Sequence, residues 1–260
     1  MAQIIAVANN KGGVGKTTTS GCIAAALAKL GHRTLMGDLD SQANLSSWHG
    51  AGKTARQNMG EFLSASITDA AAWPTVPIGE NLELLPSHKL LGEYQAQLRK
   101  KKTAQPYYLL RDRLHQLMAR HRFDYVVLDC PPNILDGMTD YALCAATAYI
   151  LPADPEPFAV EGLIEMLNVA KQVQQEYNPA LQFAGFVFPK YNPAIRGALR
   201  QQLLADIGTG FGPTTILGNV RQDARIYEAQ GLKQSIYEYA PDSRGAEDYL
   251  KITKKLIKQH

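Results

Sequence analysis

The sequence lacks the features that mark secreted and membrane proteins. It has three cysteines among 260 residues, Cys22, Cys130 and Cys144, and no pair has the C-x-x-C spacing of a metal or redox site. They are typical of small buried hydrophobic residues in a reducing compartment. No apolar run approaches the ~20 residues that a transmembrane helix needs, and the N-terminus leads into a strand rather than a signal peptide. We therefore expect a soluble, cytoplasmic protein.

The chain also carries little excess charge of either sign. The 27 lysines and arginines nearly balance 24 aspartates and glutamates, which leaves a formal net charge of +3 with histidine neutral. Any binding of nucleic acid therefore has to come from a local basic patch rather than from overall charge. With 45% hydrophobic residues, the chain can build a large core, and its length suits one α/β domain or a domain and a half.

A glycine-rich loop is the clearest chemical feature. Residues 4–8 are typical of a short buried strand, residues 20–30 of a helix, and between them lies N-N-K-G-G-V-G-K-T-T. In this context the glycines let backbone N–H groups converge on a phosphate at a helix N-terminus. Lys16 then reaches the outer phosphates, and the Thr17 hydroxyl is placed to bind Mg²⁺. The residues predicted to bind the nucleotide are Lys11, Gly12, Gly13, Val14, Gly15, Lys16, Thr17 and Thr18.

Carboxylates follow two further predicted strands. Residues 33–38 are expected to form the second strand, which ends in Asp38, with Asp40 on the same side of the strand by alternation. Carboxyl ends of parallel strands face the same crevice, so this pair is placed to orient a metal-bound water and an attacking water. Asp129 ends a second apolar run, as a Walker B strand requires for delivering one carboxylate to Mg²⁺. The alternative is that these aspartates are structural caps.

Predicted strands alternate with helices through most of the chain. Residues 46–80 look irregular, with glycine and proline interrupting short helical pieces. Elsewhere the alternation predicts a single doubly wound, mostly parallel sheet with helices on both faces. Further strands are expected at residues 149–154 and 183–190.

Four motifs resemble the ParA/MinD superfamily, and ParA/Soj-type partition ATPases in particular. They are the deviant Walker A loop K-G-G-x-G-K-T, in which Asn10 stands at the usual glycine position, D-x-D-x-Q-x-N at 38–44, D-C-P-P at 129–132 and S-R-G-A-E at 243–247. Asn133 replaces the family's usual serine, and Leu217-Gly218 departs from its Pro-Arg. The resemblance runs from residue 3 to about 250. It implies one P-loop NTPase domain over residues 1–260, and we expect no N-terminal helix-turn-helix.

The resemblance also implies a mechanism. ATP with Mg²⁺ would be sandwiched in a homodimer, and Lys11 would cross to the partner's nucleotide as a finger in trans. Asp40 would position the attacking water, which makes Lys11, Lys16 and Asp40 the expected catalytic residues. The expected metal site is Thr17 with Asp38 and Asp129, the aspartates acting through water. A lone subunit would hydrolyse ATP slowly, until a partner stimulates it.

The family implies that the ATP-bound dimer binds DNA without sequence preference and becomes nucleoid-associated. A ParB-like centromere-binding protein or cargo adaptor would then trigger hydrolysis, and the cargo would be a plasmid, a chromosome or a protein assembly. Lysines recur on one face of the predicted last helix, opposite Tyr249, Ile252 and Leu256. The candidate DNA-binding residues are Arg196, Arg200, Arg221, Arg225, Lys251, Lys254, Lys255 and Lys258.

Other nucleotide switches and enzymes of this fold are weighed against that interpretation. A MinD-type membrane-cycling ATPase in division-site placement would use the last helix as an anchor, but its apolar face has no Trp or Phe and S-R-G-A-E favours ParA. An iron–sulphur reductase needs a shared cysteine set, which Cys130 and Cys144 do not provide. Amide-forming synthetases usually lack the outer lysine, and a tyrosine kinase of this type would have a tyrosine-rich tail.

Overall fold

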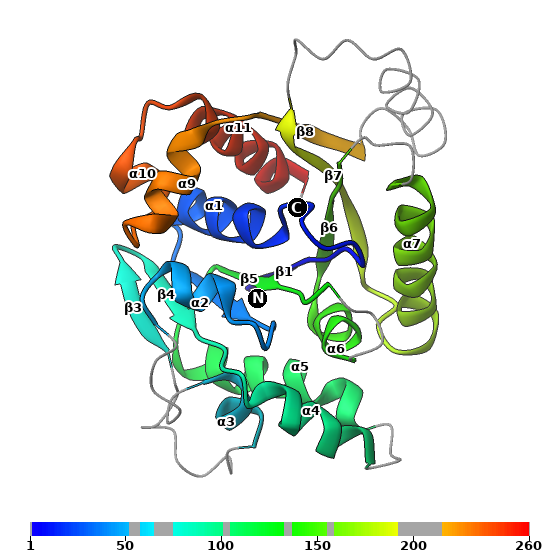
Figure 1. Cartoon of the computed structure of the whole chain (residues 1–260). Coiled ribbons are helices and arrows are strands. Elements are labelled where there is room, and N and C mark those ends of the chain that lie inside the picture. Colours follow the sequence, from blue (N-terminus) through cyan, green and yellow to red (C-terminus); the bar gives the residue numbers. More distant parts are fainter. Residues whose placement is uncertain are drawn as a thin grey trace.

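The fold is built around one eight-stranded sheet (Figure 1). A computed structural model describes residues 2–51, 58–64, 75–100, 105–132, 137–154, 159–191 and 215–259. The strand order is β3-β4-β2-β5-β1-β6-β7-β8, and within these residues only β3 runs antiparallel to its neighbour. The strands are β1 (Gln3–Val7), β2 (Thr34–Asp38), β3 (Val76–Gly79), β4 (Leu82–Leu85), β5 (Tyr125–Asp129), β6 (Ala148–Pro152), β7 (Gln182–Tyr191) and β8 (Ile216–Arg221).

Helices cover both faces of the sheet, as the sequence predicted (Figure 1). One face packs against α1 (Lys16–Lys29), α2 (Asn44–Trp48), α9 (Ala224–Gly231), α10 (Ile236–Tyr239) and α11 (Arg244–Gln259). The other packs against α3 (Met59–Ser64), α4 (Leu91–Lys100), α5 (Gln105–Arg120), α6 (Met138–Ala145) and α7 (Ala159–Glu176).

Alternation along β1 explains the two-sided core. Ile4 and Ala6 contribute to the hydrophobic cluster on one face, and Ile5 and Val7 to the cluster on the other. Burial on both faces is what makes the central strands nearly continuous apolar runs, and it is why they were predictable from sequence. The predicted strands are confirmed, with ends shifted by at most two residues.

The expectation of irregular structure over residues 46–80 was wrong at its end. Residues 76–79 form β3, which pairs with β4 through a register that shifts between Pro77 and Gly79. The strand escaped detection because it is a half-exposed edge strand that contains proline, which sheets tolerate only at such edges.

The carboxyl ends of β1, β2, β5 and β7 meet at one edge of the sheet, because all four run parallel. The loop between β1 and α1 lies at this edge, and α1 starts immediately after it. Side chains that follow these strands are therefore gathered around the N-terminus of α1, which is where crevices form in open α/β sheets.

Candidate nucleotide-binding site

The glycine-rich loop has the backbone that phosphate binding requires. Gly13 and Gly15 have φ of 76° and 88°, in the left-handed region that glycine enters without steric cost. A Cβ on Gly15 would also lie 2.9 Å from Cγ of Pro189, so β7 approaches the loop closely. Helix α1 begins at Lys16 with no side-chain cap and no acidic residue in its first turn. Its N–H groups and the positive end of its dipole are thus available to an anion.

Lys16 is held inside the loop. The side chain is 8% exposed, and its Nζ donates to the carbonyl of Lys11 at 2.8 Å. Burial lowers the pKa of Lys16, while the carboxylate of Asp129 is the main influence that opposes the shift. The ammonium therefore sits where it can neutralise an anion cradled by the loop.

Two asparagines tie the start of the loop to neighbouring elements. Asn9 donates from Nδ2 to the Pro152 carbonyl at 2.7 Å, and its Oδ1 accepts from the Lys11 N–H at 2.9 Å. Asn10 donates to the carboxylate of Glu165 on α7. The loop is thus anchored to β6 and to α7 just before the residues that are predicted to hold the phosphates.

Asp38 and Asp129 occupy paired positions on β2 and β5. The Asp38 carboxylate accepts from the backbone N–H of Asp40 (3.1 Å) and from the N–H and hydroxyl of Ser46 (2.8 and 2.6 Å). Burial raises the pKa of Asp38 above its usual range. These bonds shape the turn between β2 and α2, which is the capping role that the sequence left open; the predicted metal role of Asp38 stays a prediction.

The Asp129 carboxylate can still accept further hydrogen bonds or bind a metal ion. Its Oδ1 accepts from the Ser20 hydroxyl at 3.0 Å, whereas Oδ2 is buried and accepts no hydrogen bond from the residues that are described. Burial raises the pKa of Asp129, and the charge of Asp38 raises it further, while the nearby Thr17 hydroxyl lowers it. An orphaned carboxylate oxygen beside a threonine hydroxyl suits Mg²⁺, which takes one or two carboxylates and completes its shell with phosphates and water.

The described residues contain no group of three or more His, Cys, Asp or Glu side chains that could hold a metal ion. A cation at Thr17 and Asp129 would therefore take most of its ligands from a bound phosphate chain and water. This arrangement is typical of Mg²⁺ bound together with a nucleotide rather than of an all-protein metal cage.

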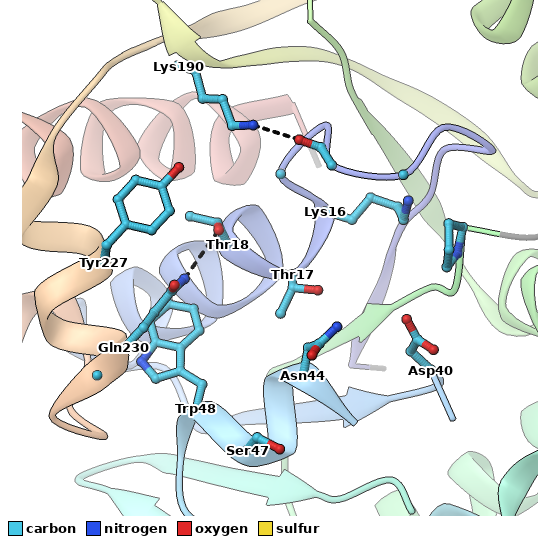
Figure 2. Close-up of a pocket in the computed structure, with 15 residues that line it drawn as sticks. Lys16, Thr17, Thr18, Asp40, Asn44, Ser47, Trp48, Lys190, Tyr227 and Gln230 are labelled. Carbon is cyan, nitrogen blue, oxygen red and sulfur yellow. Dashed lines mark hydrogen bonds between the residues drawn. The ribbon is translucent and has the colours of Figure 1, made fainter. Parts of the chain in front are cut away.

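A cavity of about 670 Å³ opens over the loop and the start of α1, within the size range of sites for small molecules and cofactors. Figure 2 shows Lys16 and Asp40 at one end of it and Trp48, Tyr227 and Gln230 at the other. Asp40 is 9% exposed, lines the cavity, and is oriented by the Gln42 N–H, which donates to its Oδ1 at 2.9 Å. The predicted residues brought together on the cavity wall are Gly12, Gly13, Gly15, Lys16, Thr17, Thr18 and Asp40.

Two other predicted loop residues are placed differently. Val14 is 3% exposed, so it can contribute only its backbone to a ligand. Lys11 is half-buried and is not among the residues found to line the cavity in the described part of the chain. The two lysines of the motif are therefore not equivalent, because only Lys16 faces the cavity of its own subunit.

Several cavity residues were missed by sequence analysis. Gln230 on α9 donates from Nε2 to the Thr18 hydroxyl at 3.3 Å, and Trp48 on α2 donates from Nε1 to the Gln234 carbonyl at 2.8 Å. Long-range packing brings α2 and α9 to the loop, and nothing local in the sequence signals it. The missed residues that line the cavity are Asn44, Ser47, Trp48, Pro132, Lys190, Tyr227, Gln230 and Gly231.

The candidate DNA-binding residues fall into three groups. Arg196 and Arg200 lie outside the described residues. The guanidinium of Arg221 is bidentate to Asp248, at 2.8 and 2.9 Å, and also contacts Glu247 at 3.3 Å, so three charges of mixed sign meet there. The remaining candidates lie on α9 and α11: Arg225, Lys251, Lys254 and Lys258 are exposed and Lys255 is half-buried. In α11 the apolar face predicted opposite the lysines is buried.

No helix within the described ranges is long and apolar enough to cross a membrane.

Comparison with known proteins finds relatives that match almost the whole chain. A family profile described as an AAA domain matches residues 2–183. The chromosome partitioning protein ParA of Caulobacter vibrioides is 34% identical and covers 98% of this chain and 94% of its own length. The sporulation initiation inhibitor protein Soj of Bacillus subtilis is 33% identical, with 98% of each chain covered.

Solved structures show the same fold. Cobyrinic acid a,c-diamide synthase from Mycobacterium smegmatis, crystallised with an ATP analogue and magnesium, is 30% identical with a TM-score of 0.81, over 100% of this chain and 96% of that one. McdA of Cyanothece, in a complex with ATP, is 20% identical with a TM-score of 0.84, over 99% and 96% of the two chains, and supports the fold alone. Given sequence relatives that match almost the whole chain at 33–34% identity, the chain belongs to the ParA/Soj family of partition ATPases.

Proposed function

We propose that this chain is an ATP-dependent dimerising switch that binds DNA without sequence preference and partitions or positions a plasmid, chromosome or protein cargo. One observation carries the proposal: the motif holds two lysines, and only Lys16 faces its own cavity. A lysine of the loop that does not line the cavity of its own subunit, such as Lys11, would act in a face-to-face dimer, where it reaches the nucleotide of the second subunit.

Different residues have different roles in the proposed ATP hydrolysis. Backbone N–H groups from Gly12 to Thr18 cradle the phosphates, and Lys16 neutralises them from within the loop. Thr17 and Asp129 would hold Mg²⁺, which supplies charge that offsets the phosphate oxygens. Asp40, oriented by the Gln42 N–H at the cavity wall, positions the attacking water. The site is incomplete until the second Lys11 arrives, so a lone subunit is slow.

The test separates the two lysines. Lys11→Ala should bind ATP with wild-type affinity in calorimetry but lose at least ~10³-fold in phosphate release, the lower end of what a finger in trans supplies. Lys89→Ala, an exposed lysine in a turn away from the cavity, is the matched control and should behave as wild type. Wild-type hydrolysis by Lys11→Ala would refute the crossing role.

The dimer's DNA contacts are assigned to the lysine stripe of α11, because the apolar face of this helix is buried while Lys251, Lys254 and Lys258 are exposed. Replacing Lys251, Lys254 and Lys258 by alanine should weaken DNA binding equally for unrelated sequences. It should also flatten the slope of log affinity against log salt by about 3 units for each subunit of the dimer, at ~0.9 for each phosphate that the variant no longer neutralises. Lys171→Ala on α7 serves as the control; an unchanged salt slope in the triple variant would remove the stripe from the interface.

Two alternatives are distinguished by simple assays. A MinD-type membrane cycle needs an apolar helix face for the bilayer, yet Tyr249, Ile252 and Leu256 of α11 are buried in the core. Sedimentation with anionic vesicles in ATP at low salt should therefore leave the protein in solution. An amide-forming synthetase would release phosphate only with a carboxylate acceptor and a nitrogen donor, whereas the proposed switch releases it from ATP with DNA and a ParB-like adaptor. In cells, the proposed protein is cytoplasmic and nucleoid-associated when ATP is bound.

A further inference from the structure

Lys190 is a third lysine at the phosphate loop, delivered by a distant part of the chain. It lies at the carboxyl end of β7, where the register with β8 shifts between Phe188 and Tyr191. Its backbone has φ of 68°, in the left-handed region that non-glycine residues seldom enter. Such irregularities bend a strand end and re-aim a side chain, and they persist where surrounding contacts hold them.

The re-aimed side chain contacts the loop directly. Nζ of Lys190 donates to the carbonyl oxygen of Gly13 at 2.7 Å (Figure 2). The ring of the preceding Pro189 lies against Gly15. Lys190 is exposed and also lines the cavity. The end of β7 therefore contacts the loop at two glycines, through a ring at one and through an ammonium group at the other.

The contact fixes the direction of one backbone donor. In a planar trans peptide the carbonyl of Gly13 and the N–H of Val14 point in opposite directions. A Gly13 oxygen that is held toward Lys190 therefore turns the Val14 N–H away from Lys190. Glycine on one side of this peptide makes it free to rotate unless something holds it.

We propose that Lys190 is a positioning residue for the nucleotide: its ammonium holds the Gly13–Val14 peptide so that the Val14 N–H faces the bound phosphate. The inference rests on the proposed nucleotide-binding function of the cavity and deepens it. The phosphate concerned lies next to the loop, so it is common to ADP and ATP. Lys190 acts through the backbone, so it affects both nucleotides alike.

The chain offers a closely matched control for a test. Lys233 is also an exposed lysine in the left-handed region, with φ of 59°, but it lies near Gly50 and is not among the residues found to line the cavity. Lys190→Met keeps the apolar stem and removes the donor, Lys190→Arg restores a donor, and Lys233→Met repeats the same change away from the loop. Each variant is titrated with ADP and with ATP, in Mg²⁺, by calorimetry.

Lys190→Met should bind both nucleotides about 5- to 20-fold more weakly, as expected for an exposed hydrogen bond to a charged group. Lys190→Arg should recover to within about threefold, and Lys233→Met should match wild type. In the nucleotide-free protein, Lys190→Met should also speed hydrogen exchange at the Val14 amide without changing the melting temperature, because only a local constraint is removed.

Three results would overturn the inference. They are unchanged affinity in Lys190→Met, an equal loss in Lys233→Met, and a loss confined to ATP, which would mean direct contact with the terminal phosphate. Failure of the wild-type protein to bind either nucleotide would instead overturn the proposed function. The exchange rate at Val14 would then still decide whether Lys190 holds the peptide.

Discussion

We expect the buried carboxylate of Asp129 to lower the stability of the nucleotide-free protein, because its surroundings suit a bound ligand better than an empty site. The side chain is 1% exposed, its Oδ2 accepts no hydrogen bond within the described residues, and it faces the like charge of Asp38. Burial, and then Asp38, raises the pKa of Asp129. Asp129→Asn keeps an acceptor for the Ser20 hydroxyl and removes the charge. We therefore expect this variant to unfold less readily than wild type in the absence of nucleotide, while losing Mg²⁺-dependent nucleotide affinity.

The sign of the pH dependence follows from linkage. A folded-state pKa above the usual value near 4 means that the folded chain holds this proton more tightly than the unfolded chain does. The contribution of Asp129 to stability is thus fully present below about pH 4 and is lost as the pH rises through the raised pKa. The advantage of Asp129→Asn should be near zero at pH 4 and grow toward pH 8.

The expected size at neutral pH is about 1–3 kcal/mol, the cost of one buried polar group left without a partner. For a chain of this length that corresponds to about 3–10 °C in melting temperature. Thermal unfolding from pH 4 to pH 8 without nucleotide measures it, with Asp242→Asn as the control for an exposed aspartate. A lower melting temperature for Asp129→Asn at pH 8, or a gain that does not depend on pH, would refute the reasoning.

Two further predictions concern packing around α1. A Cβ on Gly21 would lie 2.4 Å from Cζ3 of Trp48, so Gly21→Ala should cost a net ~1–2 kcal/mol, because overpacking outweighs the ~1 kcal/mol gained in helix propensity. Urea unfolding measures the loss of stability. A shift in tryptophan emission would confirm that the packing around Trp48 has changed, and wild-type stability would contradict the prediction. Tyr249 is fully buried and its hydroxyl lies 3.2 Å from Oγ1 of Thr19, so Tyr249→Phe should cost about 0.5–1.5 kcal/mol with unchanged ATP affinity; no change in urea midpoint would mean that the bond contributes nothing.

Local features of the sequence were enough to predict the frame of the site. The glycine loop is contiguous, and the strands that deliver Asp38 and Asp129 are buried on both faces, so apolar runs mark them. The carboxyl-end rule then places loop and carboxylates at one edge. Even there, the rule did not distinguish a carboxylate that binds a metal from one that caps a turn, because the three hydrogen bonds to Asp38 are made by Asp40 and Ser46 after the strand ends.

The rest of the cavity depends on contacts between distant residues. Gln230 meets Thr18 and Lys190 meets Gly13 across more than 170 positions of sequence. The irregular end of β7 has no signature in hydrophobic pattern, since Pro189 and Lys190 are typical of an ordinary strand end. The pairing of Arg221 with Asp248 also could not be predicted from the sequence, although it occupies guanidinium N–H groups that could otherwise contact DNA.

We propose that the cavity over the loop binds ATP with Mg²⁺ through Lys16. Calorimetric titration of the wild-type protein and Lys16→Ala with ATP and Mg²⁺ tests it most directly. We expect one ATP per chain for wild type and no measurable binding for Lys16→Ala, whose fold should be unchanged by circular dichroism. Wild-type affinity in Lys16→Ala would contradict it.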